Sequence, residues 1–146
     1  MFFKMQDVYT FPAIFDYAKD GISIEFPDLP GVLTCGWNNS EAVYMATDAL
    51  SLRLFSDETD GSQIPAPSNV LEIKQQLQDN QIVSLIWVYM PQARKRLNKI
   101  GSSKHLLFKH DDKTGKIVIP NLGDKTLPET LSGNIIKFAK ISIKEL

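Results

Sequence analysis

The sequence predicts an α+β fold, with antiparallel hairpin strands, one main helix and a further strand, followed by a smaller strand-strand-helix segment. Three observations lead to this prediction. The first forty residues show strand patterns between turn signals, a capped helical pattern follows them, and the strand and helix patterns start again after residue 100. The 146 residues are 43% hydrophobic and 23% charged, which is the balance of a globular chain with a real core.

Three short strands are predicted at the start of the chain. Residues 9–17 are aromatic and β-branched, and the turn signal at residues 19–21 makes a hairpin with the alternating residues 22–26. Two prolines and a glycine in residues 27–31 take the chain out of the sheet, because proline has no amide hydrogen for a strand ladder. Residues 32–36 then supply the third strand.

A helix is predicted after the third strand. Ser40 stands at its N-cap and Glu41 in its first turn, where the helix dipole favours an acidic side chain. Apolar residues recur every three or four positions between 43 and 54, so one stripe packs on the sheet and the helix ends near Phe55. Asp48 lies off this stripe and is expected to point elsewhere.

The second half of the chain begins with a loop and a strand. Residues 56–69 are polar and predict a loop, whereas residues 81–90 form a nearly continuous apolar run that suits a central strand. We place a module boundary after this run, because Pro91 opens a basic, helix-like stretch. The predicted modules are residues 1–90 and residues 91–146.

The C-terminal module predicts two strands and a helix. Residues 105–110 and 116–120 are the strands, and residues 111–115 form the turn between them, with a glycine near its end. Pro128 suits a first helical turn, and the apolar residues that follow it repeat at helical spacing.

The net charge of −1 hides two opposite halves. Residues 1–80 carry 4 basic and 12 acidic side chains, a net charge of −8, whereas residues 81–146 carry 12 basic and 5 acidic side chains, a net charge of +7. A basic module attracts phosphate, and an acidic one attracts basic protein surfaces.

Several classes of site are not expected. The single cysteine, Cys35, excludes an internal disulfide and a multi-cysteine zinc site, and we expect it in a strand or the core. No apolar run approaches the roughly 18 residues that cross a bilayer, so we expect a cytoplasmic protein without membrane contact. We interpret four acidic residues as three solvated carboxylates and one turn aspartate, and predict neither a metal nor a cofactor: these are Asp16, Glu25, Asp28 and Asp48.

The first module resembles the HicB antitoxin family over roughly residues 9–90. The resemblance rests on the ordered combination of residues 11–15, 24–31, Thr34, Gly36 and 40–42. It implies a partial RNase H-like fold without nuclease activity, which binds a HicA toxin and covers it, often as a dimer or larger assembly. HicB proteins usually continue into a DNA-binding helix-turn-helix or ribbon-helix-helix segment, and this chain departs from that pattern.

The C-terminal segment resembles the HicA toxin itself, a family similar to double-stranded-RNA-binding domains. The resemblance rests on residues 101–120, 125–131 and 139–142. This chain has one residue more than the family before the matched histidine. It also has hardly any room for the strand that precedes the Gly-Ser pair in the family. The resemblance therefore implies a truncated toxin-like tail.

His105 matches the histidine that HicA toxins require for RNA cleavage, so the resemblance makes it the candidate catalytic residue. An imidazole with an ordinary pKa of about 6.5 acts as general acid or base near neutral pH. Three neighbouring lysines are of the type that holds RNA phosphates: Lys104, Lys109 and Lys116. The alternative is an ordinary exposed strand histidine with no chemical role.

The leading functional prediction is a non-enzymatic antitoxin that neutralises a HicA-type, mRNA-cleaving toxin by protein-protein contact. Its partner is a separate toxin or its own toxin-like tail, with a homodimer and RNA contact through the basic half as further options. The alternative is a self-restrained ribonuclease in which the tail cleaves RNA. A lesser alternative is an operon regulator that binds DNA through the basic residues 94–96.

Overall fold

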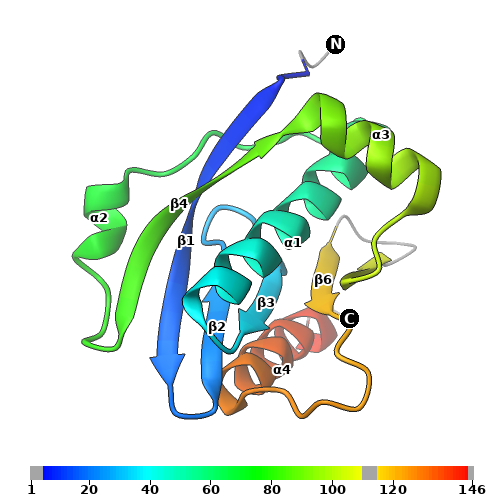
Figure 1. The fold of residues 1–146 in the computed structure, drawn as a ribbon. Coiled ribbons are helices and arrows are strands. Elements are labelled where there is room, and N and C mark those ends of the chain that lie inside the picture. Colours follow the sequence, from blue (N-terminus) through cyan, green and yellow to red (C-terminus); the bar gives the residue numbers. More distant parts are fainter. Residues whose placement is uncertain (1–4, 110–114, 145–146) are drawn as a thin grey trace.

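The computed structural model describes residues 5–109 and 115–144, with side chains up to residue 139. Four antiparallel strands form the main sheet in the order β3-β2-β1-β4, and β5 and β6 form a separate two-stranded sheet. In Figure 1, α1 crosses one face of the main sheet, and the small sheet and α4 lie beside the β3 side of the molecule. The strands are β1 (Val8–Ala18), β2 (Gly21–Glu25), β3 (Leu33–Gly36), β4 (Gln81–Tyr89), β5 (His105–Lys109) and β6 (Lys116–Pro120). The helices are α1 (Asn39–Asp60), α2 (Val70–Lys74), α3 (Met90–Ile100) and α4 (Glu129–Lys144).

This architecture confirms a mixed α+β fold with an antiparallel sheet, and each predicted strand and helix is present. The predicted turn at residues 111–115 lies, except for Gly115, outside the described residues. No helix in the described part of the chain combines the length and the apolar character needed to cross a bilayer.

Strand β1 pairs with β2 on one side and with β4 on the other, and the orientation of its backbone explains how it can contain Pro12. The Tyr17 amide donates to the Asn80 carbonyl at 2.9 Å, so odd-numbered residues of β1 direct their backbone groups toward β4. Even-numbered residues, including Pro12, direct theirs toward β2. The β1-β2 pairing extends only to the Ile14-Glu25 pair, so Pro12 lies beyond it and needs no amide hydrogen.

Strand β4 is at the edge of the sheet, which corrects the prediction of a central strand. Its apolar run is explained only in part by burial: Ile86 and Val88 face α1 and are buried, whereas Leu85, Trp87 and Tyr89 are at least half exposed. A continuous apolar run therefore overstated how much of this strand is covered.

Helix α1 begins earlier and ends later than its pattern suggested. Asn38, not Ser40, is the N-cap, and its side chain accepts from the Glu41 amide. The helix continues past Phe55 to Asp60, where Gly61 caps it with a φ of 68°. A Cβ at Gly36 would lie 2.5 Å from the Ala42 amide nitrogen, so glycine is needed where β3 passes the start of α1.

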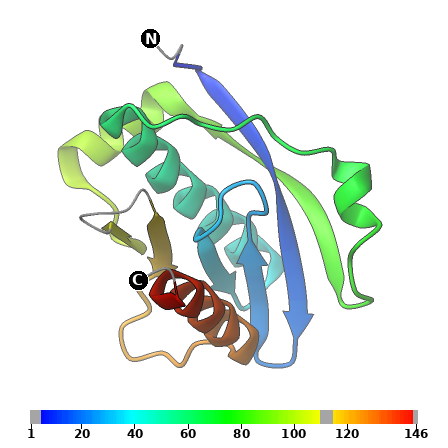
Figure 2. The ribbon, with the colours of Figure 1, turned by 180° about the vertical axis from the view of Figure 1, so that it is seen from behind.

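The C-terminal segment packs on the first ninety residues and does not stand apart from them. A parallel bridge joins Val32 to Val118, and Val118 belongs to the main core together with residues of β1, β2 and α1. Leu131 of α4 packs in a second cluster with Leu33 and Cys35 of β3. Figure 2, seen from behind, shows α4 along the outside of the β3 side of the sheet.

Candidate functional site

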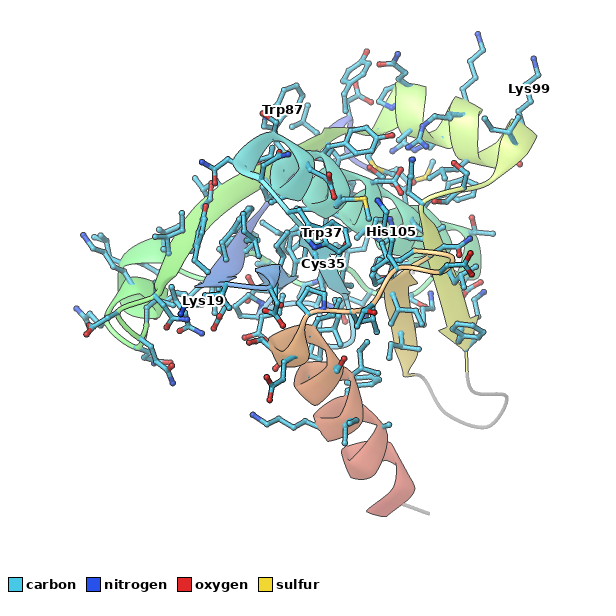
Figure 3. All side chains as sticks on the ribbon, turned by 60° about the horizontal axis from the view of Figure 1, so that its bottom comes forward. Lys19, Cys35, Trp37, Trp87, Lys99 and His105 are labelled. Atoms are coloured by element: carbon cyan, nitrogen blue, oxygen red, sulfur yellow. The ribbon has the colours of Figure 1, made fainter. Side chains whose placement is uncertain are left out.

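The site predicted around His105 lies inside the protein, between α1 and the C-terminal segment. The side chain of His105 has no exposed surface, so it is not the exposed strand histidine that was the alternative interpretation. In Figure 3, His105 and Cys35 lie in the interior, whereas Trp87 and Lys99 stand at the outside. The conformation therefore buries the one histidine that the sequence singled out.

Both ring nitrogens of His105 have hydrogen-bond partners. Nδ1 lies 2.7 Å from Asp48 Oδ2, and Nε2 lies 2.7 Å from Thr34 Oγ1. An ionised carboxylate only accepts, so Nδ1 carries a proton that it donates to Asp48. Nε2 is then the acceptor for the Thr34 hydroxyl in the neutral ring. In this arrangement the imidazole offers no nitrogen to an RNA hydroxyl or phosphate.

Asp48 collects three groups from the C-terminal half. Besides His105, it accepts from Ser102 Oγ at 3.0 Å and from Arg96 Nη1 at 3.3 Å. Burial alone would raise the pKa of the Asp48 carboxyl, but the hydrogen bond from His105, assisted by Ser102 and Arg96, brings this pKa below its ordinary value. The carboxyl is only 6% exposed, which differs from the solvated side chain that the sequence suggested.

Lys116 makes a second buried ion pair with α1, about two and a half turns beyond Asp48. Its Nζ lies 2.6 Å from Asp57 Oδ1 and 2.9 Å from Asp60 Oδ2. Lys109 pairs with the same Asp60 at 3.0 Å, but it is 47% exposed. Hydrogen bonds from Lys116 and then Lys109 lower the pKa of Asp60. Lys104, the third predicted phosphate-binding lysine, is exposed.

A third pair completes this row of contacts near the C-terminal end of α1. Arg94 donates to both carboxylate oxygens of Glu58 at 2.9 Å, and the Tyr9 hydroxyl donates to Glu58 at 3.3 Å. We use the name seam for three acidic residues of α1, Asp48, Asp57 and Glu58, together with their basic partners from residues 94–116. The acidic and basic halves of the chain thus meet within one molecule.

The other acidic residues that were considered as metal ligands lie apart. Asp16 accepts from Asn80 and Gln81, and Asp28 accepts from the Ser68 amide and hydroxyl. Burial raises the pKa of Glu25. In the parts of the chain that the structure describes, no three histidine, cysteine or acidic side chains are grouped to hold a metal ion.

Cys35 is buried in β3, as expected of a strand or core residue. Burial raises the pKa of its thiol to about 11, so the thiol stays protonated and unreactive at neutral pH.

A family model, described as the HicB-like antitoxin of bacterial toxin-antitoxin system, matches residues 11–117. This chain belongs to the HicB-like antitoxin family. The match runs from β1 through the first residues of β6, so it covers β5 as well as the N-terminal sheet.

One curated relative and two solved structures are also similar to this HicB-like chain. Antitoxin HicB 2 of Photorhabdus laumondii is 38% identical over 58 residues, which are 40% of this chain and 42% of that protein. The chain therefore spans less than half of the length of this curated relative. A chain of the toxin-antitoxin complex from Streptococcus pneumoniae aligns over 94% of this chain and 98% of its own, with 18% identity and a TM-score of 0.51. A chain of a HicA3 and HicB3 toxin-antitoxin complex aligns over 53% and 95%, with 17% identity and a TM-score of 0.47.

The seam is the feature of this HicB-like chain that sequence reasoning missed. Asp57 was not a candidate residue, and Asp48 was considered only as a metal ligand and interpreted as solvated. Each is an isolated acid on a helix, and its partner lies 57 or 59 residues further along. The opposite charges of the two halves were the available signal.

Proposed function

We propose that this chain is an antitoxin that binds and neutralises a HicA-type, mRNA-cleaving toxin by protein-protein contact. The observation that carries the proposal is the match of the HicB-like antitoxin family over residues 11–117. The partial RNase H-like architecture implied by the resemblance is part of the same proposal, with the sheet and α1 as its main elements.

The surroundings of His105 favour an antitoxin over a self-restrained ribonuclease. A general base needs a nitrogen within hydrogen-bond reach of its substrate, and here Asp48 and Thr34 occupy both nitrogens. Lys116, a predicted phosphate contact, is also buried and paired with two carboxylates. Cleavage through these residues would require the segment to leave the seam.

We also propose that the toxin-like tail, residues 91–146, is a partner of the N-terminal module within the same chain. Support comes from the seam, where three α1 acids each pair with a basic residue of the tail. Ordinary charge complementarity gives such contacts their specificity. A separate toxin would be recognised by the surface that this cis contact leaves exposed.

The test is a toxin inhibition assay with the full-length chain. RNA integrity is followed over time with a HicA-type toxin alone, with toxin plus increasing amounts of this chain, and with this chain alone. We expect cleavage to stop near one chain per toxin and no cleavage by the chain alone. Unchanged cleavage at a large excess of the chain would contradict the antitoxin proposal.

His105→Ala separates the antitoxin from the ribonuclease. If RNA is degraded by the wild-type chain and not by a folded His105→Ala chain, the tail is an active enzyme. Equal RNA integrity with both chains, together with toxin inhibition by the wild type, agrees with the antitoxin. Circular dichroism of both chains shows that the comparison is made between folded proteins.

A further inference from the structure

Helix α4 packs on the face of the main sheet that is opposite to α1. Ile22 and Ile24 of β2 belong to the main core with α1, so Ser23 between them points to the other face. Cys35 of β3 pairs with Ser23 in the antiparallel register and shares its face. Cys35 packs there with Leu131 of α4 in the second hydrophobic cluster. Figure 2 shows α4 in front of this side of the sheet, so α4 covers one face of β2 and β3.

The contacts that anchor α4 are concentrated at its N-terminal end. Pro128 and Leu131 are fully buried, whereas Ile136 further along the helix is 51% exposed. The carboxylate of Asp20, in the turn between β1 and β2, accepts from the Glu129 amide at 2.8 Å. A carboxylate from a distant segment therefore caps the first turn of α4.

The face under α4 includes polar groups whose burial is unfavourable. Ser23 is 2% exposed, and among the described residues its hydroxyl has no hydrogen-bond partner. A hydroxyl that loses water without gaining a partner costs free energy. Glu25 lies on the same face, and burial raises the pKa of its carboxyl although the charge of Lys137 acts in the opposite direction. Both groups favour a state in which water reaches this face.

The chain before α4 is anchored without the help of α4. Strand β6 is held by Val118 in the main core and by Lys116 in the seam. The Asn121 amide then donates to the Lys104 carbonyl at 2.8 Å. Gly123 follows with a φ of 62°, and a Cβ there would meet nothing within 4 Å. A glycine in open space after an anchored strand is suited to be a hinge.

We propose that residues 121–144 form a lid that opens from β2 and β3 as one unit, while the main core and the seam stay folded. Its latch is the contact between Asp20 and the first turn of α4, and its hinge is the segment around Gly123. Opening hydrates the Ser23 hydroxyl and exposes Cys35. The lid therefore changes which face of the sheet meets solvent without unfolding the chain.

Cys35 reports the position of the lid, because it is the single cysteine of the chain and is fully buried when the lid is closed. The test measures how fast an aromatic disulfide reagent labels Cys35 in the folded full-length chain, at urea concentrations below the unfolding transition. We expect labelling at least about 10-fold faster than global unfolding allows, with a weaker dependence on urea, because a lid exposes less surface than unfolding does. Labelling with the rate and the urea dependence of global unfolding would overturn the proposal.

Two substitutions should change the labelling rate in opposite directions. Asp20→Ala removes the cap of α4 and should speed labelling about 5-fold. Ser23→Ala removes the hydroxyl that closure leaves unpaired, and it should slow labelling about 5-fold. Asp79→Ala changes another exposed turn acid and is the matched control, which should label at the wild-type rate. A wild-type rate in either of the first two variants would contradict the assigned latch and the cost of closure.

Hydrogen exchange identifies the part of the chain that opens. A helix as short as α4 is marginal in water once it leaves its support, so its amides should exchange with the same opening free energy as the labelling of Cys35. The Val118 amide bonds to the Gly31 carbonyl and should be at least about 10-fold better protected. Equal protection of α4 and Val118 would show that the lid does not open by itself.

Discussion

His105 Nδ1 and Asp48 Oδ2 lie 2.7 Å apart and connect β5 to α1 across 57 residues of sequence. Both side chains are buried, and Thr34 of β3 holds the opposite side of the ring. The pair therefore joins three elements, the tail, the main helix and the edge of the sheet. We therefore expect this pair to stabilise the packing of the tail on the first module.

Asp48→Asn should destabilise the protein by about 2–4 kcal/mol, because Arg96 and the Nδ1 proton of His105 lose a charged acceptor in a buried place. Urea unfolding measures the change. Asp79→Asn is the control, since Asp79 is exposed, and it should shift the free energy of unfolding by less than about 0.5 kcal/mol. Equal effects of the two variants would show that Asp48 contributes no more than a surface acid.

The contribution of Asp48 should disappear in acid. Its pKa in the folded protein is below the ordinary 3.8, so the unfolded chain takes up the proton first as pH falls. The stabilisation is present above about pH 4 and is lost as pH falls through the folded-state pKa. We expect the stability gap between wild type and Asp48→Asn to narrow below about pH 4. A gap that stays constant down to the acid unfolding limit would be inconsistent with an ionised Asp48.

Lys116→Met should cost about 2–4 kcal/mol, because it leaves the Asp57 carboxylate, which is 4% exposed, without its closest cation. Lys109→Met removes a lysine that is 47% exposed and should cost at most about 1 kcal/mol. Thermal and urea unfolding give the loss in stability of each variant. The comparison is between a buried and an exposed ion pair that both connect to α1. A larger loss for Lys109→Met would reverse this ranking.

Gly31→Ala should loosen the contact between the first module and β6. Gly31 has a φ of 94°, and a Cβ there would overlap the Lys116 carbonyl oxygen. Its own carbonyl accepts from the Val118 amide at 2.8 Å. We expect a loss of about 2 kcal/mol or more and faster hydrogen exchange at Val118.

The control for that experiment is the same substitution in α4. A Cβ at Gly133 meets nothing within 4 Å, so Gly133→Ala should raise stability by about 0.5–1 kcal/mol through helix propensity alone. If both alanine variants changed stability in the same direction, the close approach at Gly31 would not be the cause.

Local patterns were enough to predict most of the elements. The hairpin of β1 and β2, the stop at Pro27 and the start of α1 follow from turn residues, prolines and capping groups that act within a few positions. The end of α1 was placed too early, near Phe55, because the polar residues after it resemble a loop. In the structure Ser56 and Asp57 are buried instead.

The site depended on distant partners and could not be predicted in the same way. A resemblance directed attention to His105, but its burial depends on Asp48 and Thr34, and no spacing rule connects residues so far apart. The position of β4 at the edge was missed for a related reason. Periodicity reports how apolar a strand is, and it does not report how many neighbours the strand has within one chain.

The order of the seam along the chain also matters while the protein is being made. A ribosome adds about 5–20 residues per second, so the 57 residues between Asp48 and His105 take about 3–11 seconds to follow. For most of that interval the whole of α1, which ends at Asp60, has been synthesised, whereas the basic partners of its carboxylates have not. In each newly synthesised chain the acidic side chains of α1 therefore precede their basic partners by several seconds, and a later segment of the same chain then covers them.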